Sequence, residues 1–434
     1  MTERWHNWSG SVVAAPARIA APRSEGELAA VVRGATRLRA AGAGHSFAPL
    51  CATDDTLVRI DGLDGDAGAG IQLAPDGRSA WVPAGWSLRR VAAALWELGR
   101  SLPNQGDIDA QALGGAIATG THGTGAELGS LASFARAFRM VLADGSIVEC
   151  SGDADAELPE LFEAQRLSLG LLGIATRIRI DVAPAYRLEQ RIARVGLDEV
   201  CARFAEIAGA HRHAEFFVFP YAGDVILKTL HPTDDASPFR PPRSDGEDEF
   251  QRICDLCSRL PSLTGVMQHR MMAEIRGSRR VGPAHLIFPS ERRVRFEEME
   301  YELPRDAGLA ALREAIRWIR RRRLPVVFPF EFRWVAADYI WLSPFHRGPC
   351  ASISIHQYAG LRWQELFAEV EPVFRAHGGR PHWGKRHSLT ARDVFALYPR
   401  AGAFCAVRRR VDPQQKFANQ HLICLFDLEA PERP

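Results

Sequence analysis

Glu331 and Arg333 are two charged residues whose types and spacing could act together on one small molecule. They are two positions apart in a segment with strand character, so their side chains point to the same face of the strand. The arginine would donate hydrogen bonds to a substrate rich in hydroxyl groups, and the glutamate would accept them. A structural ion pair within a sheet explains the same two residues about equally well.

Two further residues could take part in such chemistry. His356 is the candidate general base because imidazole titrates near neutral pH, although a core histidine bonded to backbone is the alternative. Lys385, in His382-Trp383-Gly384-Lys385, could stabilise negative charge on a cofactor or on a developing alkoxide. Most lysines lie in water, but the aromatic and glycine neighbours of Lys385 favour a place in a site.

The first of two glycine-rich runs, Gly42-Ala43-Gly44-His45-Ser46-Phe47, follows a strand predicted over 36–40. A Rossmann fingerprint needs a third glycine that opens a helix and an acidic residue roughly 20 positions on. Phe47 occupies that third position and Ala48-Pro49 follows, so a nest of backbone N–H groups would hold phosphates instead.

The second run, 114–125, carries no charge and contains too many glycines for the interior of a regular element. Backbone in such a run approaches something closely, either a flat cofactor or, in the alternative interpretation, a packed neighbour. Two runs about seventy residues apart, each containing a histidine beside a glycine, favour cofactor binding over tight packing.

Composition excludes several classes of function. The chain of 434 residues has 54 basic and 52 acidic side chains, and a net charge of +2 does not create the field that nucleic-acid binding requires. Cys254 and Cys257 lack the further ligands of a zinc site, so we expect two thiols on a helix face and no metal. No apolar run of about 18 residues occurs, and we expect a cytoplasmic protein without a transmembrane segment.

Helices and strands alternate through the first part of the chain. Ser24 and Glu27 predict a capping box that begins a helix ending near Gly34, and a strand over 79–82 precedes a helix over 87–98. Asp144-Gly145 predicts a hairpin, and strand character resumes over 170–180.

Ala183-Pro184-Ala185 interrupts this alternation, and strands of antiparallel character follow, such as 215–219 and 294–303. The stretch 231–249 is predicted to be a long surface loop, and Arg320–Arg323 a positively charged helix end. Because the chain is too long for one core, we expect α+β domains that share a cleft.

Several motifs together resemble the aldonolactone oxidoreductases, a family of the vanillyl-alcohol oxidase superfamily. Ala43–Phe47 resembles the family's first flavin loop, Ala118–Gly125 its second, and Leu169–Ile174 the segment on the adenine side. Matching substrate and closing motifs follow in the same order at 331–333, 356–358, 380–385, 412–413, Phe417 and Asn419.

The resemblance implies a two-domain vanillyl-alcohol oxidase-like fold. An α+β FAD-binding domain of the PCMH type would span 10–185, a substrate domain with an antiparallel sheet and flanking helices 186–380, and a C-terminal segment, 381–434, would return to the flavin domain. The residues implied to bind FAD are Gly42, Ala43, Gly44, His45, Ser46, Phe47, Gly115, Thr119, Gly120, Thr121, His122, Gly123, Ile174 and His382. In this family the histidine matching His45 is commonly bonded covalently to the flavin.

The implied reaction is FAD-dependent oxidation of an aldono-1,4-lactone at the hydroxyl next to the carbonyl, with Glu331, Arg333, His356 and Lys385 as catalytic residues. Oxygen or a cytochrome-like carrier would accept the electrons. Ala112 stands where related polyol oxidases have serine, which argues against the alternative of an alditol or other sugar alcohol as substrate. A flavin-binding protein without turnover and a nicotinamide-dependent dehydrogenase are the rival interpretations, and the incomplete fingerprint disfavours the latter.

Overall fold

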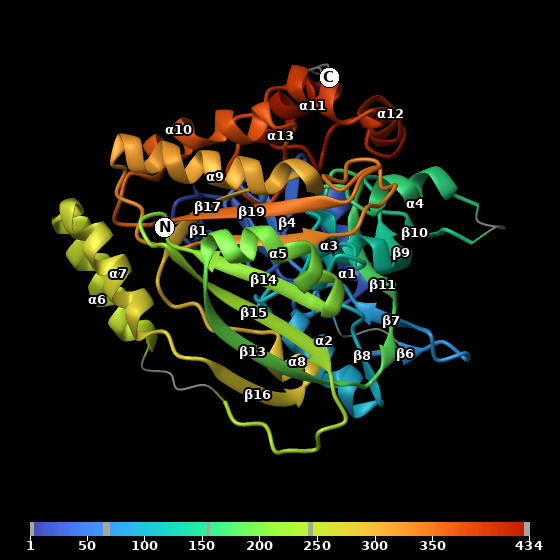
Figure 1. The fold of residues 1–434 in the computed structure, drawn as a ribbon. Helices are drawn as coiled ribbons and strands as arrows, with labels where there is room; N and C mark the ends of the chain where they lie inside the picture. Colours follow the sequence, from blue (N-terminus) through green and yellow to red (C-terminus); the bar gives the residue numbers. More distant parts are fainter. Residues whose placement is uncertain (1–3, 64–69, 154–156, 242–245, 429–434) are drawn as a thin grey trace.

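Two large groups of strands organise the molecule (Figure 1). The computed structural model describes residues 4–63, 70–153, 157–241 and 246–428. A three-stranded parallel sheet and a five-stranded antiparallel sheet are formed by the N-terminal part, and an eight-stranded antiparallel sheet by residues further along the chain. The expected α+β class, with a second part built on an antiparallel sheet, is confirmed.

The parallel sheet has the order β3-β5-β4, with α1 (Glu25–Gly34) connecting β3 to β4. Its strands are β3 (Arg18–Ala20), β5 (Thr56–Arg59) and β4 (Leu38–Ala41). The predicted helix start is confirmed, because the Ser24 hydroxyl accepts from the N–H of Glu27 at 3.1 Å. The Glu27 carboxylate accepts from the N–H of Arg23 at 2.8 Å, one residue before the cap. A small hairpin, β1 (Trp5–His6) with β2 (Val13–Ala14), precedes this sheet.

The five-stranded sheet has the order β10-β9-β11-β7-β6. Its strands are β6 (Gln72–Leu73), β7 (Ser79–Pro83), β9 (Ala135–Val141), β10 (Ile147–Ser151) and β11 (Ile174–Asp181). The predicted hairpin is confirmed, with Gly145 at φ 82° in its turn. The predicted second helix is α2 (Leu88–Glu97), capped by Ser87. A helix α4 (Pro159–Gln165) and a short pair, β8 (Arg100–Ser101) with β12 (Ala183–Pro184), complete this part.

The second glycine run is more regular than its composition predicts. Its first half belongs to α3 (Leu113–Ala118), so the prediction that it could not form a regular element is wrong for that half. A Cβ atom at Gly114 would lie 3.2 Å from the backbone oxygen of Ala84, which shows that the missing side chain lets this helix lie directly against the end of β7. The second half is a loop that leads to the 3₁₀ turn η1 (Leu131–Phe134).

The eight-stranded sheet has the order β16-β13-β15-β14-β18-β19-β17-β20. Its strands are β13 (Arg187–Gly196), β14 (His213–Val218), β15 (Asp224–Pro232), β16 (Ser278–Pro283), β17 (Phe296–Pro304), β18 (Phe330–Val335), β19 (Cys350–Tyr358) and β20 (Arg380–Pro381). One face packs in a shared core against α5 (Leu197–Ala210), α9 (Arg305–Arg322) and α10 (Trp363–Ala376). These helices leave the other face for the charged residues described below.

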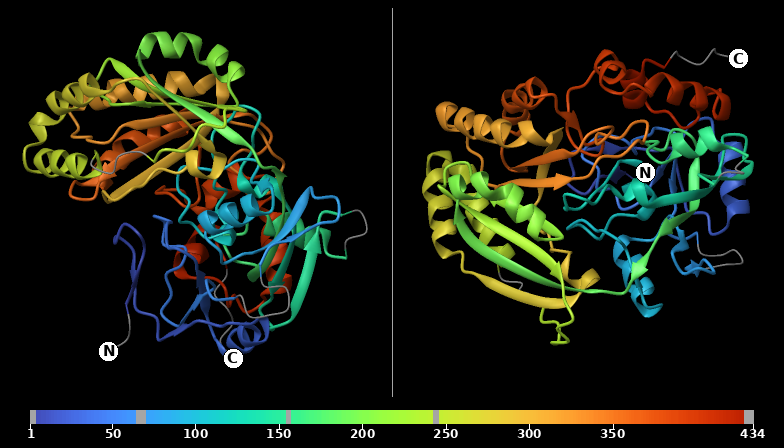
Figure 2. Two further views of the ribbon diagram at one scale, coloured as in Figure 1. Left: turned by 90° about the horizontal axis from the view of Figure 1, so that it is seen from below. Right: turned by 45° about the vertical axis from the view of Figure 1, so that its right-hand side comes forward.

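Four further helices lie beside this sheet, among them the yellow helices α6 and α7 (Figure 2). They are α6 (Gly246–Arg259), η2 (Pro261–Leu263), α7 (Thr264–Glu274) and α8 (Ala284–Ile287). Cys254 and Cys257 are both buried on α6 in an apolar cluster, as the helix-face interpretation predicts. The predicted loop over 231–249 is shorter than expected, because β15 runs to Pro232 and α6 begins at Gly246; residues 242–245 lie outside the described residues.

The basic segment at the end of α9 has the structural role that the sequence predicts. Arg320 donates hydrogen bonds to the backbone oxygens of Pro220 and Ala222, and Arg323 ends the helix at φ 54°. Among the described helices, none is both long and apolar enough to cross a membrane.

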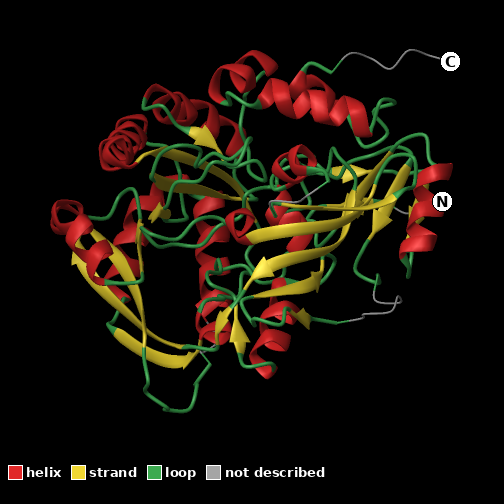
Figure 3. Cartoon of the chain, turned by 90° about the vertical axis from the view of Figure 1, so that its right-hand side faces the viewer, coloured by secondary structure: helices red, strands yellow, loops and turns green. Residues whose placement is uncertain are grey.

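The chain ends in three helices, α11 (Ala391–Leu397), α12 (Ala401–Val411) and α13 (Gln420–Phe426), seen in Figure 3 beside the strands of the N-terminal part. Lys416 donates to the backbone oxygens of Val32 at 2.8 Å and Ala143 at 3.0 Å. Asn419 donates to the backbone oxygen of Pro49 at 2.8 Å. The C-terminal segment therefore packs on the part of the molecule that the first 180 residues form.

Candidate active site

A cavity lies where the two glycine runs meet the start of β11, with about 880 Å³ of empty space that includes open solvent at its mouth. None of the described residues that line it is acidic, and Arg39 supplies a buried cation behind it. Of the residues predicted to bind the cofactor, the following line this cavity: Gly42, Ala43, Gly44, His45, Ser46, Gly115, Thr119 and Ile174.

Free backbone donors distinguish this cavity from an ordinary surface hollow. Among the described residues, nothing accepts a hydrogen bond from the N–H groups of 43–46 or of Gly115. Gly44 has a φ of 68°, the left-handed conformation that lets successive amides converge on one point. A Cβ at Gly115 would meet nothing within 4 Å and would extend into open space. Free amides, glycine walls and the absence of acidic lining fit the diphosphate of FAD.

His45 lies at the edge of this cavity, half-buried beside Trp8, with ring centroids 5.7 Å apart. Burial lowers the pKa of His45, and Lys385 and Arg295 lower it further. The imidazole is therefore neutral at neutral pH, with one ring nitrogen free of a proton. Lys385 also lies 5.2 Å from the centre of the Phe47 ring, so the first glycine loop contacts a candidate catalytic residue.

The remaining residues predicted to bind the cofactor are not among those that line this cavity. Phe47 is buried in an apolar cluster with Trp8 and Phe296. Gly123 packs tightly, because a Cβ there would lie 2.4 Å from the backbone oxygen of Gln105. Gly120, Thr121, His122 and His382 are buried as well, and the last two belong to a charged network.

Strand β17 supplies the centre of that network. Glu298, Glu300 and Glu302 alternate with Met299, Tyr301 and Leu303, so the carboxylates share one face and the apolar side chains face the helical core. All three glutamates are buried. The sequence analysis missed them, although acidic residues at 298, 300 and 302 that alternate with the apolar residues 299, 301 and 303 are a readable signal.

All four candidate catalytic residues converge on these carboxylates or on each other. Arg333 donates to Glu300 at 2.9 Å and forms an ion pair with Glu331 at 3.2 Å. Lys385 donates to Glu298, and His356 Nε2 lies 3.4 Å from the same carboxylate. The structure thus brings together residues that are more than fifty positions apart in the sequence.

Three buried atoms of this group have no hydrogen bond to any described residue. Within the described part of the chain, nothing accepts a hydrogen bond from Arg333 Nε or donates one to Glu302 Oε2, and Glu331 Oε1 has only the ion pair with Arg333 Nη1 at 3.2 Å. Buried polar atoms without partners are costly and concentrate at functional sites. One acceptor and one donor on neighbouring side chains can therefore bind a hydroxyl and a carbonyl of the same molecule.

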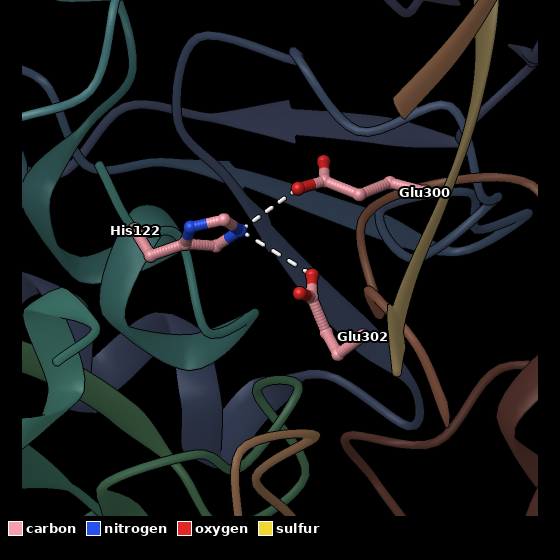
Figure 4. A group of neighbouring side chains, drawn as sticks. All are labelled: His122, Glu300 and Glu302. Carbon is pink, nitrogen blue, oxygen red and sulfur yellow. Dashed lines mark hydrogen bonds and ion pairs between the residues drawn. The ribbon is translucent and has the colours of Figure 1, made fainter. Parts of the chain in front are cut away.

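His122 lies deeper, between Glu300 and Glu302 (Figure 4). Its Nε2 is 2.8 Å from Glu300 and 3.3 Å from Glu302. Burial alone would lower the pKa of His122, but the two carboxylates outweigh burial and raise it to about 9. The three ligand atoms lie within 4.8 Å of one another, a spacing that a metal could use, but a protonated imidazole and the hydrogen bond from Arg333 indicate an ion-pair network.

A second cavity of about 2030 Å³, open to solvent, reaches the charged network at His356. Phe296, Phe328 and Phe288 contribute apolar walls, and Lys228 and Asp107 contribute charges. A small polar molecule could therefore enter it and contact His356.

Comparison with protein families identifies both parts of the chain. Residues 178–424 match the model of D-arabinono-1,4-lactone oxidase, more than half of the chain. The chain belongs to the D-arabinono-1,4-lactone oxidase family. Residues 16–151 match the FAD-binding domain, so the glycine-lined cavity lies in a recognised flavin domain and the chain is an FAD-dependent oxidoreductase.

Relatives in this family cover nearly the whole chain. The L-gulono-1,4-lactone dehydrogenase of Mycobacterium tuberculosis is 36% identical over 97% of this chain and 98% of its own length. The L-gulonolactone oxidase of Bos taurus is 27% identical over 98% of both chains. An alditol oxidase of Streptomyces is 29% identical over 97% of this chain and 98% of its own length.

A solved structure shares the fold of this family member. Cholesterol oxidase from B. sterolicum superposes with a TM-score of 0.83 over 98% of this chain and 97% of its own, at 15% sequence identity. At that identity the likeness supports the two-part fold with a flavin domain and says nothing of substrate.

Proposed function

We propose that the protein oxidises an aldono-1,4-lactone at the hydroxyl next to the carbonyl, in a flavin-dependent reaction. The observation that carries the proposal is the buried pair Glu331 and Arg333, joined by an ion pair at 3.2 Å and with Arg333 Nε free of an acceptor among the described residues, in a network beside the flavin domain. When bound, FAD accepts a hydride at its N5 atom. The names of the relatives support a lactone as substrate.

The proposed roles follow from what each side chain can still bind. Arg333 donates to the lactone carbonyl and Glu331 accepts from a neighbouring hydroxyl, so the pair orients the reacting carbon. Lys385 stabilises negative charge as the hydroxyl proton leaves. His356, which borders the second cavity, is the proposed acceptor of that proton.

We propose that FAD lies in the glycine-lined cavity, with its diphosphate on the free amides of 43–46 and Gly115. Phe47, Thr119, Gly120, Thr121, Gly123 and Ile174 shape the surrounding backbone, and His122 and His382 contribute from the charged network. We further propose a covalent bond from His45, since its lowered pKa leaves a nucleophilic ring nitrogen at neutral pH. The domain division 10–185, 186–380 and 381–434 completes this proposal.

The first test is the visible spectrum of the purified protein before and after acid precipitation, followed by L-gulono-1,4-lactone. A yellow pellet supports the covalent bond, and a yellow supernatant contradicts it; His45→Ala is the matched control that must release the colour. Bleaching by the lactone supports the reaction. Bleaching by xylitol but by no lactone would contradict it. Oxygen and cytochrome c, offered separately, then distinguish the two acceptor classes.

Variants test the assigned residues. Glu331→Ala and Lys385→Ala are expected to keep the flavin absorbance while lowering kcat by about 100-fold or more, the usual cost of removing a preorganised polar group. Steady-state kinetics with L-gulono-1,4-lactone measures the loss. Glu199→Ala on α5, a carboxylate exposed far from the network, is the control. Full activity in both variants would remove the two residues from the site.

A further inference from the structure

A partly buried ion pair in the wall of the second cavity has no part in the proposed reaction. Lys228 Nζ donates to Asp107 Oδ1 at 3.0 Å, and both residues border the cavity that His356 also borders. Asp107 Oδ2 accepts from the hydroxyl of Ser290 at 3.3 Å. A charged pair at the side of a cavity, and not sealed behind it, can still bind a ligand.

The position of Asp107 is fixed by backbone contacts with the second glycine run. A Cβ at Gly106 would lie 2.9 Å from the backbone oxygen of His122, and a Cβ at Gly123 would lie 2.4 Å from that of Gln105. Only glycine at both places allows this approach. The carboxylate of Asp107 is therefore held in register with the loop that carries His122 into the charged network.

Lys228 is connected to the reacting residues across the sheet. Its Nζ lies 2.8 Å from Glu215, and Glu215 faces Lys228 on β15 and Arg333 on β18 in the strand register. Neighbouring strands are about 4.8 Å apart. Because β14 lies between β15 and β18, Lys228 is two strands, or about 10 Å, from Arg333 across the sheet. A six-carbon lactone whose ring lies at Arg333 can extend its side chain toward Lys228.

Both groups keep their charge and have bonding capacity left. Burial alone would raise the pKa of Asp107, but Lys228 and Arg292 outweigh it and lower the pKa. Burial alone would lower the pKa of Lys228, but Asp107 and Glu215 outweigh it and raise the pKa. The carboxylate oxygens have lone pairs to spare and the ammonium has a third N–H, the complement that neighbouring hydroxyl groups require.

We propose that Asp107 and Lys228 bind the side-chain hydroxyl groups of the substrate beyond the lactone ring, and so determine which aldonolactones are accepted. This inference rests on the proposed lactone oxidation. Phe288 and Phe296 of the same cavity supply apolar surface for the C–H face of that side chain.

The test compares three substrates in the holoenzyme. L-gulono-1,4-lactone has a two-carbon hydroxylated side chain, D-arabinono-1,4-lactone a one-carbon side chain, and α-hydroxy-γ-butyrolactone none. Asp107→Asn and Lys228→Met are expected to raise KM by about 10- to 100-fold for the first, since a lost hydrogen bond to a charged group costs a factor of this order. The increase in KM should be smaller for D-arabinono-1,4-lactone and absent for α-hydroxy-γ-butyrolactone.

The graded loss separates recognition from a structural role. Loss of the charge pair as a structural element would lower kcat/KM for all three lactones equally, and that result overturns the proposal. Asp224→Asn, which removes an exposed carboxylate paired with Arg194 on the same strand as Lys228, is the control and should change none. If a variant binds no flavin, Asp107→Ser, which puts a hydroxyl in place of the carboxylate, supplies the same comparison.

Failure of the proposed lactone oxidation itself would give a different result. Wild-type enzyme that turns over none of the three lactones overturns the proposed function together with this inference. Wild-type enzyme that turns over all three, with equal losses in the variants, overturns the side-chain assignment alone.

Discussion

One carboxylate oxygen of Glu300 contacts side chains from three separate parts of the chain. His122 lies 2.8 Å from Oε1, Arg333 2.9 Å and the Ser352 hydroxyl 2.8 Å. Burial alone would raise the pKa of Glu300, but Arg333 and His122 outweigh it and hold the pKa well below its usual range. Removing one partner would leave an uncompensated buried charge, so the network should respond to pH as a unit.

His122 provides a pH prediction at this scale. Its folded pKa of about 9 lies above the ordinary value of 6.5, so folding favours the protonated form. That stabilisation is fully present below about pH 6.5 and is lost as the pH rises through about 9. We expect the Tm of the protein to fall between pH 7 and 9.5.

Histidine-selective NMR checks the assignment directly. With ¹⁵N-labelled histidine, the imidazolium signal of His122 should persist until about pH 9. The spectrum of His122→Gln identifies the signal by its disappearance, and His269→Gln, an exposed histidine on α7, serves as a labelling control. A His122 signal that titrates at or below 6.5 would contradict the ion-pair network.

At the scale of elements, strand β17 shows which features could be predicted from the sequence and which could not. Its alternation is local, and the sequence analysis predicted the strand over 294–303. Which cations meet its carboxylates depends on the register with β19 and on residues 380–385, which no local pattern reveals. For the same reason the glycine loops could be predicted as a cofactor site, whereas the burial of His122 between Glu300 and Glu302 could not.

Predictions from local sequence signals succeeded where the residues of an element themselves determine where it begins and ends. The Ser24 and Ser87 caps and the Gly145 turn are observed within a few residues of their predicted places. The same reasoning gave a wrong prediction for the first half of the second glycine run. Its helix, α3, is stabilised by packing on Ala84, a tertiary contact that outweighs the low helix propensity of glycine.

Helix α3 allows a test of the flavin cavity. Gly115→Val would place a side chain in the open space that its Cβ position faces, so FAD content should fall by about tenfold or more while the fold persists. The flavin-to-protein absorbance ratio and far-ultraviolet circular dichroism measure the two effects. Gly402→Val near the start of α12, whose Cβ also meets nothing within 4 Å, should keep its flavin. Equal flavin content in both variants would place the cofactor elsewhere.

At the scale of the whole molecule, Arg39 joins segments that are distant in the sequence. It donates to the backbone oxygens of Leu50 at 2.6 Å, Leu169 at 2.6 Å and Gly170 at 3.0 Å, and also to that of Phe417 near the C-terminus. Burial lowers its pKa to about 10, so it remains charged at neutral pH. Its guanidinium thus holds the C-terminal segment against the wall of the glycine-lined cavity.

Arg39→Lys keeps the charge but replaces a planar fork by a single ammonium, which cannot reach carbonyls on three segments at once. We expect a loss of about 2–4 kcal/mol in stability, as several hydrogen bonds to one charged group are broken. Flavin retention should weaken in parallel, because Leu169 and Gly170 line the cavity. Arg37→Lys, two residues earlier, alters an exposed pair with Asp54 and should change neither. Urea unfolding and flavin release, followed together, measure both effects: a loss of stability with full flavin retention would show that the C-terminal segment is fastened independently of the cofactor cavity.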